Sequence, residues 1–241
     1  MSHRFFVTAK PEPGSQLELG KEQSHHAANV MRFQKGDQVQ LFDGYGNLFA
    51  AEMVDVTKKR VLVDVLNKVE SQTELEVDLT LAVALPKGDR QKFLIEKMVE
   101  LGVKQFIPLK TARGVSQVND KVISRIEKQV IEACKQCERN VLMQIHQEMS
   151  LSQIATEQFR PNDDTTKLLI ASPKATAHVV DFVNLRAQRY IVSVGPEGGF
   201  TDDEMDTAAT HGWEEFRMGP AILRIETAAL AAAAILGNGQ S

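Results

Sequence analysis

The stretch Tyr190-Ile-Val-Ser-Val-Gly-Pro-Glu-Gly-Gly-Phe200 decides the fold of the carboxyl-terminal part of the chain. An uninterrupted apolar run that enters a glycine-rich turn is typical of a strand buried on both faces of a parallel sheet. Thr201 and Glu204 follow with the spacing of a capping box, which predicts a helix directly after the turn. The turn therefore lies between a strand's carboxyl end and a helix's amino end, where α/β proteins bind ligands.

The residues of this turn restrict the kind of ligand that can bind there. Glycines allow the backbone to approach a ligand closely, whereas Glu197 disfavours a phosphate group. Neither glycine-rich phosphate-binding motif, G-x-G-x-x-G or G-x-x-x-x-G-K-[ST], occurs in the chain. We therefore expect a neutral or cationic ligand. A purely structural turn remains the alternative, because Gly-Pro-Glu-Gly-Gly also suits a tight turn.

A second informative stretch, Met218-Gly-Pro-Ala-Ile-Leu-Arg-Ile-Glu-Thr227, follows. A Gly-Pro turn precedes a short apolar run, and an alanine-rich helix is predicted from Glu226 to Leu236, ending at Gly237. Its small side chains suit close packing on another helix or another subunit. Arg224 and Glu226 could belong to a site or form a buried structural ion pair.

The pattern outside these stretches predicts two domains. Strands are expected at residues 79–85, 105–109, 167–171 and 189–194, with helices at 91–101, 121–140 and 202–211. This alternation indicates an α/β domain with a mostly parallel sheet. Before it, strands at 4–7, 38–43, 48–56 and 60–66 and one helical segment at 23–31 indicate a small β-barrel-like module. The polar stretch 69–74 gives domains of 1–72 and 73–241.

The composition is that of an ordinary globular protein. The 241 residues (26.7 kDa) are 43% apolar and 25% charged, which excludes disordered, collagen-like and coiled-coil classes. The longest strongly apolar stretch, 228–236, is too short to span a membrane, and no signal-peptide pattern opens the chain, so we expect a cytoplasmic protein. The two cysteines, Cys134 and Cys137, exclude a disulfide framework and are expected to pack in the core, with no metal site.

The net charge of −4 hides a basic segment. Residues 87–139 hold 12 basic and 7 acidic side chains, which makes them a candidate contact for a polyanion, with a solvated surface as the alternative. One face of the predicted helix 121–140 carries Lys121, Arg125, Lys128, Lys135 and Arg139. Strand alternation separates Phe5 from Phe6, so that one of them could be exposed and stack on a base.

The two carboxyl-terminal stretches, in this order, resemble the motifs of the SPOUT class of knotted methyltransferases. Within that class the chain is most similar to the ribosomal RNA small subunit methyltransferase E family. The similarity also includes residues 4–6, 26, 29–32, 36–37, 42–44, 85–90, 96–97, 100–103, 132–133, 136–137 and 139. It implies a PUA-like β-barrel, then a SPOUT domain with a trefoil knot, S-adenosylmethionine as methyl donor, and a homodimer.

The resemblance implies methylation of N3 of a uridine in 16S ribosomal RNA, in an assembled small subunit. The expected catalytic residues are Arg224, which would stabilise the uridine anion, and Glu226, a weaker candidate for the base. Cofactor binding is expected at Ala171, Ser172, Gly195, Pro196, Glu197, Gly198, Gly199, Met218, Gly219, Ile222, Leu223 and Thr227. RNA binding is expected at Arg4, His26, Arg32, Lys87, Arg90, Arg113, Arg125, Lys128 and Arg139.

Three positions depart from the family pattern. Ala221 stands where an arginine is usual, Ile225 where a threonine is usual, and Gly114 where a serine is common. The loss of one of two neighbouring arginines keeps two alternatives open. One is a non-catalytic RNA-binding or ribosome-assembly factor on the same fold, and the other is a SPOUT methyltransferase that acts on another RNA.

Overall fold

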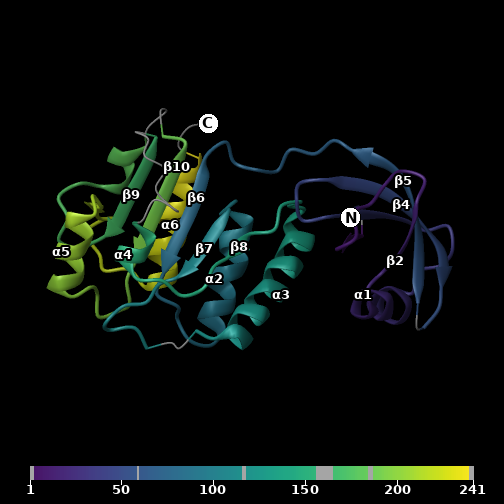
Figure 1. The fold of residues 1–241 in the computed structure, drawn as a ribbon, viewed down its shortest axis with the longest axis horizontal. Helices are drawn as coiled ribbons and strands as arrows, with labels where there is room; N and C mark the ends of the chain where they lie inside the picture. The colour runs from purple at the N-terminus through teal and green to yellow at the C-terminus, as the bar shows by residue number, and fades with distance from the viewer. Residues whose placement is uncertain (1–2, 59, 116–117, 156–164, 184–186, 239–241) are drawn as a thin grey trace. The chain divides into compact units, whose positions relative to one another are not determined.

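The computed structural model describes residues 3–58, 60–115, 118–155, 165–183 and 187–238 (Figure 1). The chain divides into two compact units. The first unit consists of residues 1–74 and 131–142, and the second of residues 75–130 and 143–241. Within the described residues, none of the helices combines the length and the apolar character needed to cross a membrane.

The first unit is built on a curled five-stranded sheet. Its strand order is β1 (Arg4–Phe6), β3 (Gln38–Phe42), β4 (Leu48–Val56), β5 (Val61–Val69) and β2 (Gln16–Glu18). β1 runs parallel to β3, and the other neighbours are antiparallel. Val61, Val63 and Val65 alternate with more exposed residues, as expected for a sheet with one face in the core. Helix α1 (Lys21–His25) continues into the π-helix η1 (His26–Met31).

Residues 131–142 return to the first unit after the chain has entered the second. Arg139 is buried and forms an ion pair with Glu74, Nη2 to Oε2 at 2.7 Å. Arg4 is also buried, with its guanidinium 5.1 Å from the ring centre of Phe42 and hydrogen-bonded to Asn140. Because burial removes water from the charge, it lowers the pKa of Arg4. The domain boundary expected between residues 72 and 73 assigns residues 131–142 to the second domain, whereas the structure groups them with the first unit. The expected boundary stays a prediction.

The second unit holds a six-stranded parallel sheet. The strand order is β11 (Glu214–Phe216), β9 (Thr166–Ala171), β10 (Arg189–Val194), β6 (Asp78–Val83), β7 (Gln105–Pro108) and β8 (Gln144–Ile145). All neighbouring strands run parallel. The helices are α2 (Asp89–Glu100), α3 (Asp120–Cys137), α4 (Leu151–Ile154), the 3-10 helix η2 (Val179–Phe182), α5 (Asp202–Thr210) and α6 (Ile225–Asn238).

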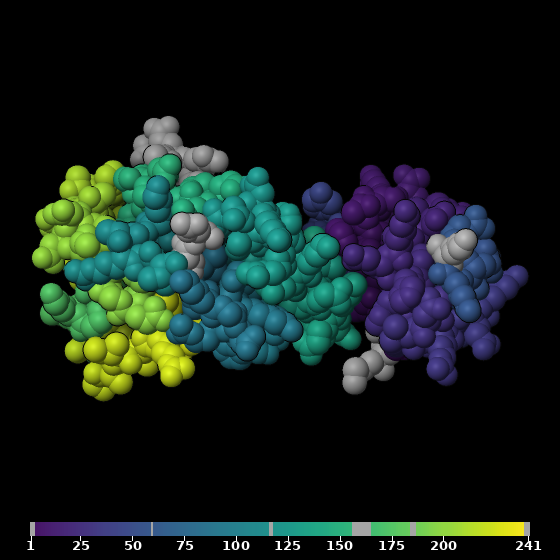
Figure 2. Space-filling view, turned by 90° about the horizontal axis from the view of Figure 1, so that it is seen from below, coloured from purple at the N-terminus to yellow at the C-terminus, as the bar shows by residue number. Residues whose placement is uncertain are grey.

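Helices cover both faces of this parallel sheet. α6 packs on β6, β10 and α2, while a core cluster joins Ile154 of α4 and Ala208 of α5 to Ile191 of β10. Figure 2 shows the blue-teal segment that contains α2 beside the yellow carboxyl-terminal segment on the surface of this unit. The predicted α/β fold with a PUA-like sheet is confirmed. The trefoil knot stays a prediction, since a strand order does not define how the chain is threaded.

The end of the last helix was predicted wrongly. Helix α6 runs through Gly237 to Asn238, so this glycine is no helix stop. Gly237 is buried, and a Cβ atom there would lie 2.9 Å from Cδ1 of Leu75. Its missing side chain therefore lets the helix pack closely against Leu75. The short elements β2, β8, β11, α4 and η2 were not predicted from the sequence.

Candidate functional site

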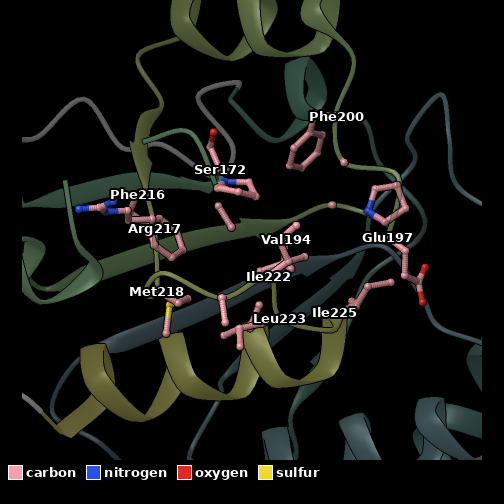
Figure 3. A pocket seen from close by; sticks show the side chains of 18 residues that line it. Ser172, Val194, Glu197, Phe200, Phe216, Arg217, Met218, Ile222, Leu223 and Ile225 are labelled. Atoms are coloured by element: carbon pink, nitrogen blue, oxygen red, sulfur yellow. The ribbon is translucent and has the colours of Figure 1, made fainter. Parts of the chain in front are cut away.

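A pocket opens where strands β9 and β10 end, beside the start of α6 (Figure 3). Three loops form it, namely residues 172–173 after β9, 195–200 after β10 and 217–223 before α6, together with Ala171 at the end of β9. Ile225 and Ala228 of α6 complete its wall. The space measures about 670 Å³, including the part open to solvent. The pocket lies at the end of the sheet where the sequence predicts a ligand.

The capping box that follows the glycine-rich turn is present. The Thr201 side chain accepts a hydrogen bond from the Glu204 amide at 3.2 Å, and the Glu204 carboxylate accepts one from the Thr201 amide at 2.8 Å. The second carboxylate oxygen of Glu204 accepts the amide hydrogen of Ala112 at 2.8 Å. Side-chain and backbone groups thus fix both the start of α5 and the loop after β7.

Two glycines of the turn leave room for neighbouring side chains, and the third allows a left-handed backbone. A Cβ atom at Gly195 would lie 2.9 Å from the ring of Phe200. At Gly198 it would lie 3.2 Å from Cδ of Arg113, whose guanidinium donates to the Gly198 carbonyl at 2.5 Å. Gly199 has φ +67°, a left-handed conformation that disfavours other residues. The side chains of Phe200 and Arg113 therefore pack directly on the backbone of the turn.

The walls of the pocket are mainly apolar. Val194, Phe216, Ile222 and Leu223 line it, and Ile222 is 84% exposed. The one arginine among the lining residues, Arg217, donates from Nε to Nε2 of His178 at 3.1 Å, and in Figure 3 its guanidinium points away from the pocket. Apolar walls with loop backbone suit a neutral ring system better than a phosphate.

Arg90 connects two carboxylates at one end of the pocket. Its Nη1 lies 2.8 Å from Oε1 of Glu197 and 3.8 Å from Oε2 of Glu226. The hydrogen bond from Arg90 lowers the pKa of Glu197, and the same bond raises the pKa of Arg90. Glu226 is 7% exposed, and its Oε2 has no hydrogen-bond partner among the described atoms.

Arg224 is exposed, which rules out a buried Arg224–Glu226 pair. The positive charge of Arg224 contributes to the lowered pKa of Glu197. The pairing considered from sequence is therefore wrong, because the cation next to Glu226 is Arg90 and comes from the start of α2. Arg224 itself follows the pocket-lining Leu223 in the chain.

The structure gathers most of the residues expected to bind the cofactor. Those that line the pocket are Ala171, Ser172, Gly195, Pro196, Glu197, Gly199, Met218, Gly219, Ile222 and Leu223. Gly198 and Thr227 do not line it, since Gly198 faces Arg113. Sequence reasoning missed the lining residues Val194, Phe200, Phe216, Arg217, Ile225 and Ala228. Phe200 directly follows the glycines and could have been found, whereas Phe216 belongs to the unrecognised β11.

The three family departures have different surroundings. Ala221 is exposed at the pocket, where an arginine side chain would have room in solvent. Ile225 is 4% exposed and forms part of the wall. A Cβ atom at Gly114 would lie 2.9 Å from Oγ1 of Thr111, so a serine there requires the Thr111 side chain to move.

The residues expected to bind RNA fall into three groups. Arg4 and Arg139 are buried in the first unit, so the structure gives them a structural role instead of the predicted RNA contact. Three other arginines bond to groups within the second unit. Arg90 pairs with Glu197, Arg113 donates to the Gly198 carbonyl, and Arg125 donates to Oε1 of Gln91 at 2.8 Å. The remaining residues, His26, Arg32, Lys87 and Lys128, are exposed, as Arg113 and Arg125 are too.

Comparison with known proteins agrees with this architecture. Residues 73–237 match the model of an RNA methyltransferase domain, and residues 19–66 match that of an RNA methyltransferase PUA domain. The ribosomal RNA small subunit methyltransferase E of Synechocystis sp. is 32% identical over 95% of this chain and 75% of that protein. The chain belongs to the ribosomal RNA small subunit methyltransferase E family. The family member of Bacillus subtilis is 30% identical over 87% of this chain and 84% of that protein.

Two solved structures related to this family contain a ligand. The ribosomal RNA small subunit methyltransferase E of Neisseria gonorrhoeae, bound to S-adenosyl methionine, has a TM-score of 0.89 and 27% identity over 98% of this chain and 97% of its own. A putative methyltransferase of Legionella pneumophila, in complex with the cofactor SAM, has a TM-score of 0.88 and 31% identity over the same shares.

Proposed function

We propose that this family member transfers a methyl group from S-adenosylmethionine to N3 of a uridine in 16S ribosomal RNA. The observation that supports this most is the pocket at the ends of β9 and β10, in a chain that shares nearly its whole length with two structures holding that cofactor. The exposed residues among those expected to bind RNA are the candidates for contact with the RNA, namely His26, Arg32, Lys87, Arg113, Arg125 and Lys128.

The residues of the pocket fit this cofactor. An adenine ring is planar and neutral, which suits the apolar walls at Ile222 and Leu223, and its edge can bond to main-chain groups of the loops. Glu197, whose lowered pKa keeps it ionised, supplies negative charge at the end where the cationic sulfonium would lie. When bound, the cofactor supplies a methyl group on a positive sulfur, which an anionic nitrogen can take in a single displacement.

Residues of this chain would supply the acid–base chemistry. Uridine N3 is a poor nucleophile until its proton leaves, after which negative charge spreads over the base oxygens. The exposed guanidinium of Arg224 is suited to stabilise that charge. The carboxylate of Glu226, with one oxygen free of hydrogen bonds, is the candidate to accept the proton.

The proposal includes the form in which the protein acts. We infer a homodimer that binds an assembled small subunit through a PUA-like domain of residues 1–72 and a methyltransferase domain of residues 73–241. The alanine-rich helix α6 supports the dimer, because Ala231, Ala234 and the neighbouring Leu230 are only half-buried in this single chain. The small side chains of the two alanines allow a partner helix to approach closely.

Calorimetric titration with S-adenosylmethionine tests the cofactor site. Gly219 lines the pocket with an ordinary φ, and a Cβ atom there would meet nothing within 4 Å, so Gly219→Val fills the space without strain. Gly20→Val in the first unit meets the same conditions and is the matched control. We expect binding by the wild type and by Gly20→Val, and loss of binding by Gly219→Val.

Methyl transfer to small ribosomal subunits that lack the modification tests the reaction itself. Nuclease digestion and mass spectrometry of the product should show 3-methyluridine. Another methylated nucleoside would overturn the N3 assignment and favour a different RNA target. Absence of cofactor binding by a folded wild-type protein would favour the non-catalytic RNA-binding alternative.

A further inference from the structure

Tyr45 is the most exposed large apolar side chain of the described residues, at 88%. It stands at the tip of the turn between β3 and β4 in the first unit. The two aromatic residues that the sequence suggested for base stacking are much less exposed than Tyr45. Phe5 is 4% exposed, and the half-buried Phe6 packs on Phe42 with ring centres 5.5 Å apart.

The turn that carries Tyr45 is held rigidly. The buried carboxylate of Asp43 accepts hydrogen bonds from the Tyr45 amide at 2.8 Å, from the Asn47 amide at 3.1 Å and from the Asn47 side chain at 2.6 Å. Gly44 and Gly46, on either side of Tyr45, have φ of +81° and +99°. Because both conformations favour glycine, the local sequence fixes the backbone that places the tyrosine.

Residues 140–142, which also belong to the first unit, form hydrogen bonds with the same turn. The Gly46 amide donates to the Asn140 carbonyl at 3.1 Å, and the Leu142 amide donates to the Gly44 carbonyl at 3.0 Å. A Cβ atom at Gly44 would lie 3.0 Å from the Leu142 side chain, so the contact is close. The ring of Tyr45 is therefore presented to solvent from a backbone fixed on both sides.

We propose that Tyr45 stacks on an unpaired base of the RNA that this protein binds. An aromatic ring on a rigid backbone loses little conformational entropy when a base covers it, and every base offers a face for stacking. The turn itself consists of glycines, Asp43 and Asn47, so the groups beside the ring are polar or carry no side chain, and the apolar Val141 and Leu142 that pack on its glycines are half-buried. This inference rests on the proposed function, because it takes RNA as the ligand.

The experiment measures the affinity of three variants for purified small ribosomal subunits that lack the modification. Tyr45→Ala removes the ring, Tyr45→Phe keeps it without the hydroxyl, and Leu66→Ala removes another exposed apolar side chain of the first unit as a control. We expect Tyr45→Ala to bind about five- to a hundredfold more weakly, which corresponds to the loss of one stacked base. Tyr45→Phe and Leu66→Ala should bind as the wild type does.

Ultraviolet cross-linking of the wild-type complex, followed by mass spectrometry, identifies what covers the ring. A nucleotide adduct on the peptide that contains Tyr45 supports the proposal. Unchanged affinity of Tyr45→Ala, an equal loss in Tyr45→Phe, or an adduct with a ribosomal protein at this peptide would each overturn it.

Methyl transfer by the wild type, measured on the same subunits, separates this inference from the proposed function. Transfer by a wild type whose affinity does not depend on Tyr45 leaves the function standing and removes the stacking. A nucleotide adduct at Tyr45 without any methyl transfer leaves the stacking standing and removes the function. A wild type that does not bind the subunits overturns both.

Discussion

Arg224 combines exposure with a place next to the pocket, so its loss should affect chemistry without affecting the fold. For Arg224→Ala we expect methyl transfer to fall about 100- to 1000-fold, the usual effect of removing one group that stabilises a developing negative charge. Cofactor affinity should stay near the wild-type value in calorimetry. Arg60→Ala, which removes an exposed arginine of the first unit, is the control. Transfer retained by Arg224→Ala would remove this residue from the mechanism.

Arg90 determines at which pH Glu197 loses its charge. Its hydrogen bond lowers the pKa of Glu197, so the carboxylate stays ionised further into the acidic range than an ordinary glutamate. In Arg90→Gln this pKa should return toward its ordinary value of 4.5, and cofactor affinity should start to fall at a higher pH than in the wild type. Titrations at several acidic pH values measure this shift. The same pH dependence in Glu197→Gln would show that another group causes it.

The buried arginines show what a sequence pattern leaves undecided at the level of single residues. Arg139 lies in a basic segment, yet its partner Glu74 is 65 positions away in the chain, and Arg4 reaches Asn140 across 136 positions. Charge counting treats every arginine of such a segment as a surface residue. Whether an arginine forms a buried ion pair or contacts RNA depends on which distant residues pack around it. Neither the spacing nor the composition of the sequence reveals those residues.

At the scale of elements, the prediction succeeded where the apolar pattern is long. β6, β10, α2 and α5 were found within a few residues, because a buried strand or a capped amphipathic helix has a strong local signal. β2, β8 and β11 are two to three residues long and exist through pairing with longer neighbours. The wall of the pocket contributed by Phe216 of β11 was missed for this reason.

Leu75 links two elements that each need a glycine. A Cβ atom at Gly102, which has φ +78°, would lie 2.7 Å from Cγ of Leu75, and the same side chain contacts Gly237 of α6. For Gly102→Ala we expect a loss of about 1–3 kcal/mol in the free energy of unfolding, from overpacking and from the left-handed backbone. In a Leu75→Ala background the loss should be smaller, because the overpacking is gone. Urea unfolding of the four proteins measures both values, and equal losses would contradict the role of Leu75.

At the scale of the whole molecule, two units share one chain, so a global probe would mix their unfolding. Trp213 is the single tryptophan, is 5% exposed and belongs to the core of the second unit. Its fluorescence therefore reports the unfolding of the second unit alone, while circular dichroism reports both. A difference between the two transitions would show that the units unfold separately, as their two cores allow.

His146 should make the second unit less stable in mild acid. It is bonded to Oε1 of Gln105 at 2.8 Å, and burial lowers its pKa below the ordinary value of 6.5. The folded state therefore prefers the neutral ring, and the stability present above pH 6.5 is lost as the pH falls toward and through the lowered pKa. Between about pH 7.5 and pH 5.5, we expect the urea midpoint of Trp213 fluorescence to fall more in the wild type than in His146→Gln. His25→Gln, at an exposed position of the first unit, should behave as the wild type. An equal fall in wild type and His146→Gln would assign the acid sensitivity to other groups of the second unit.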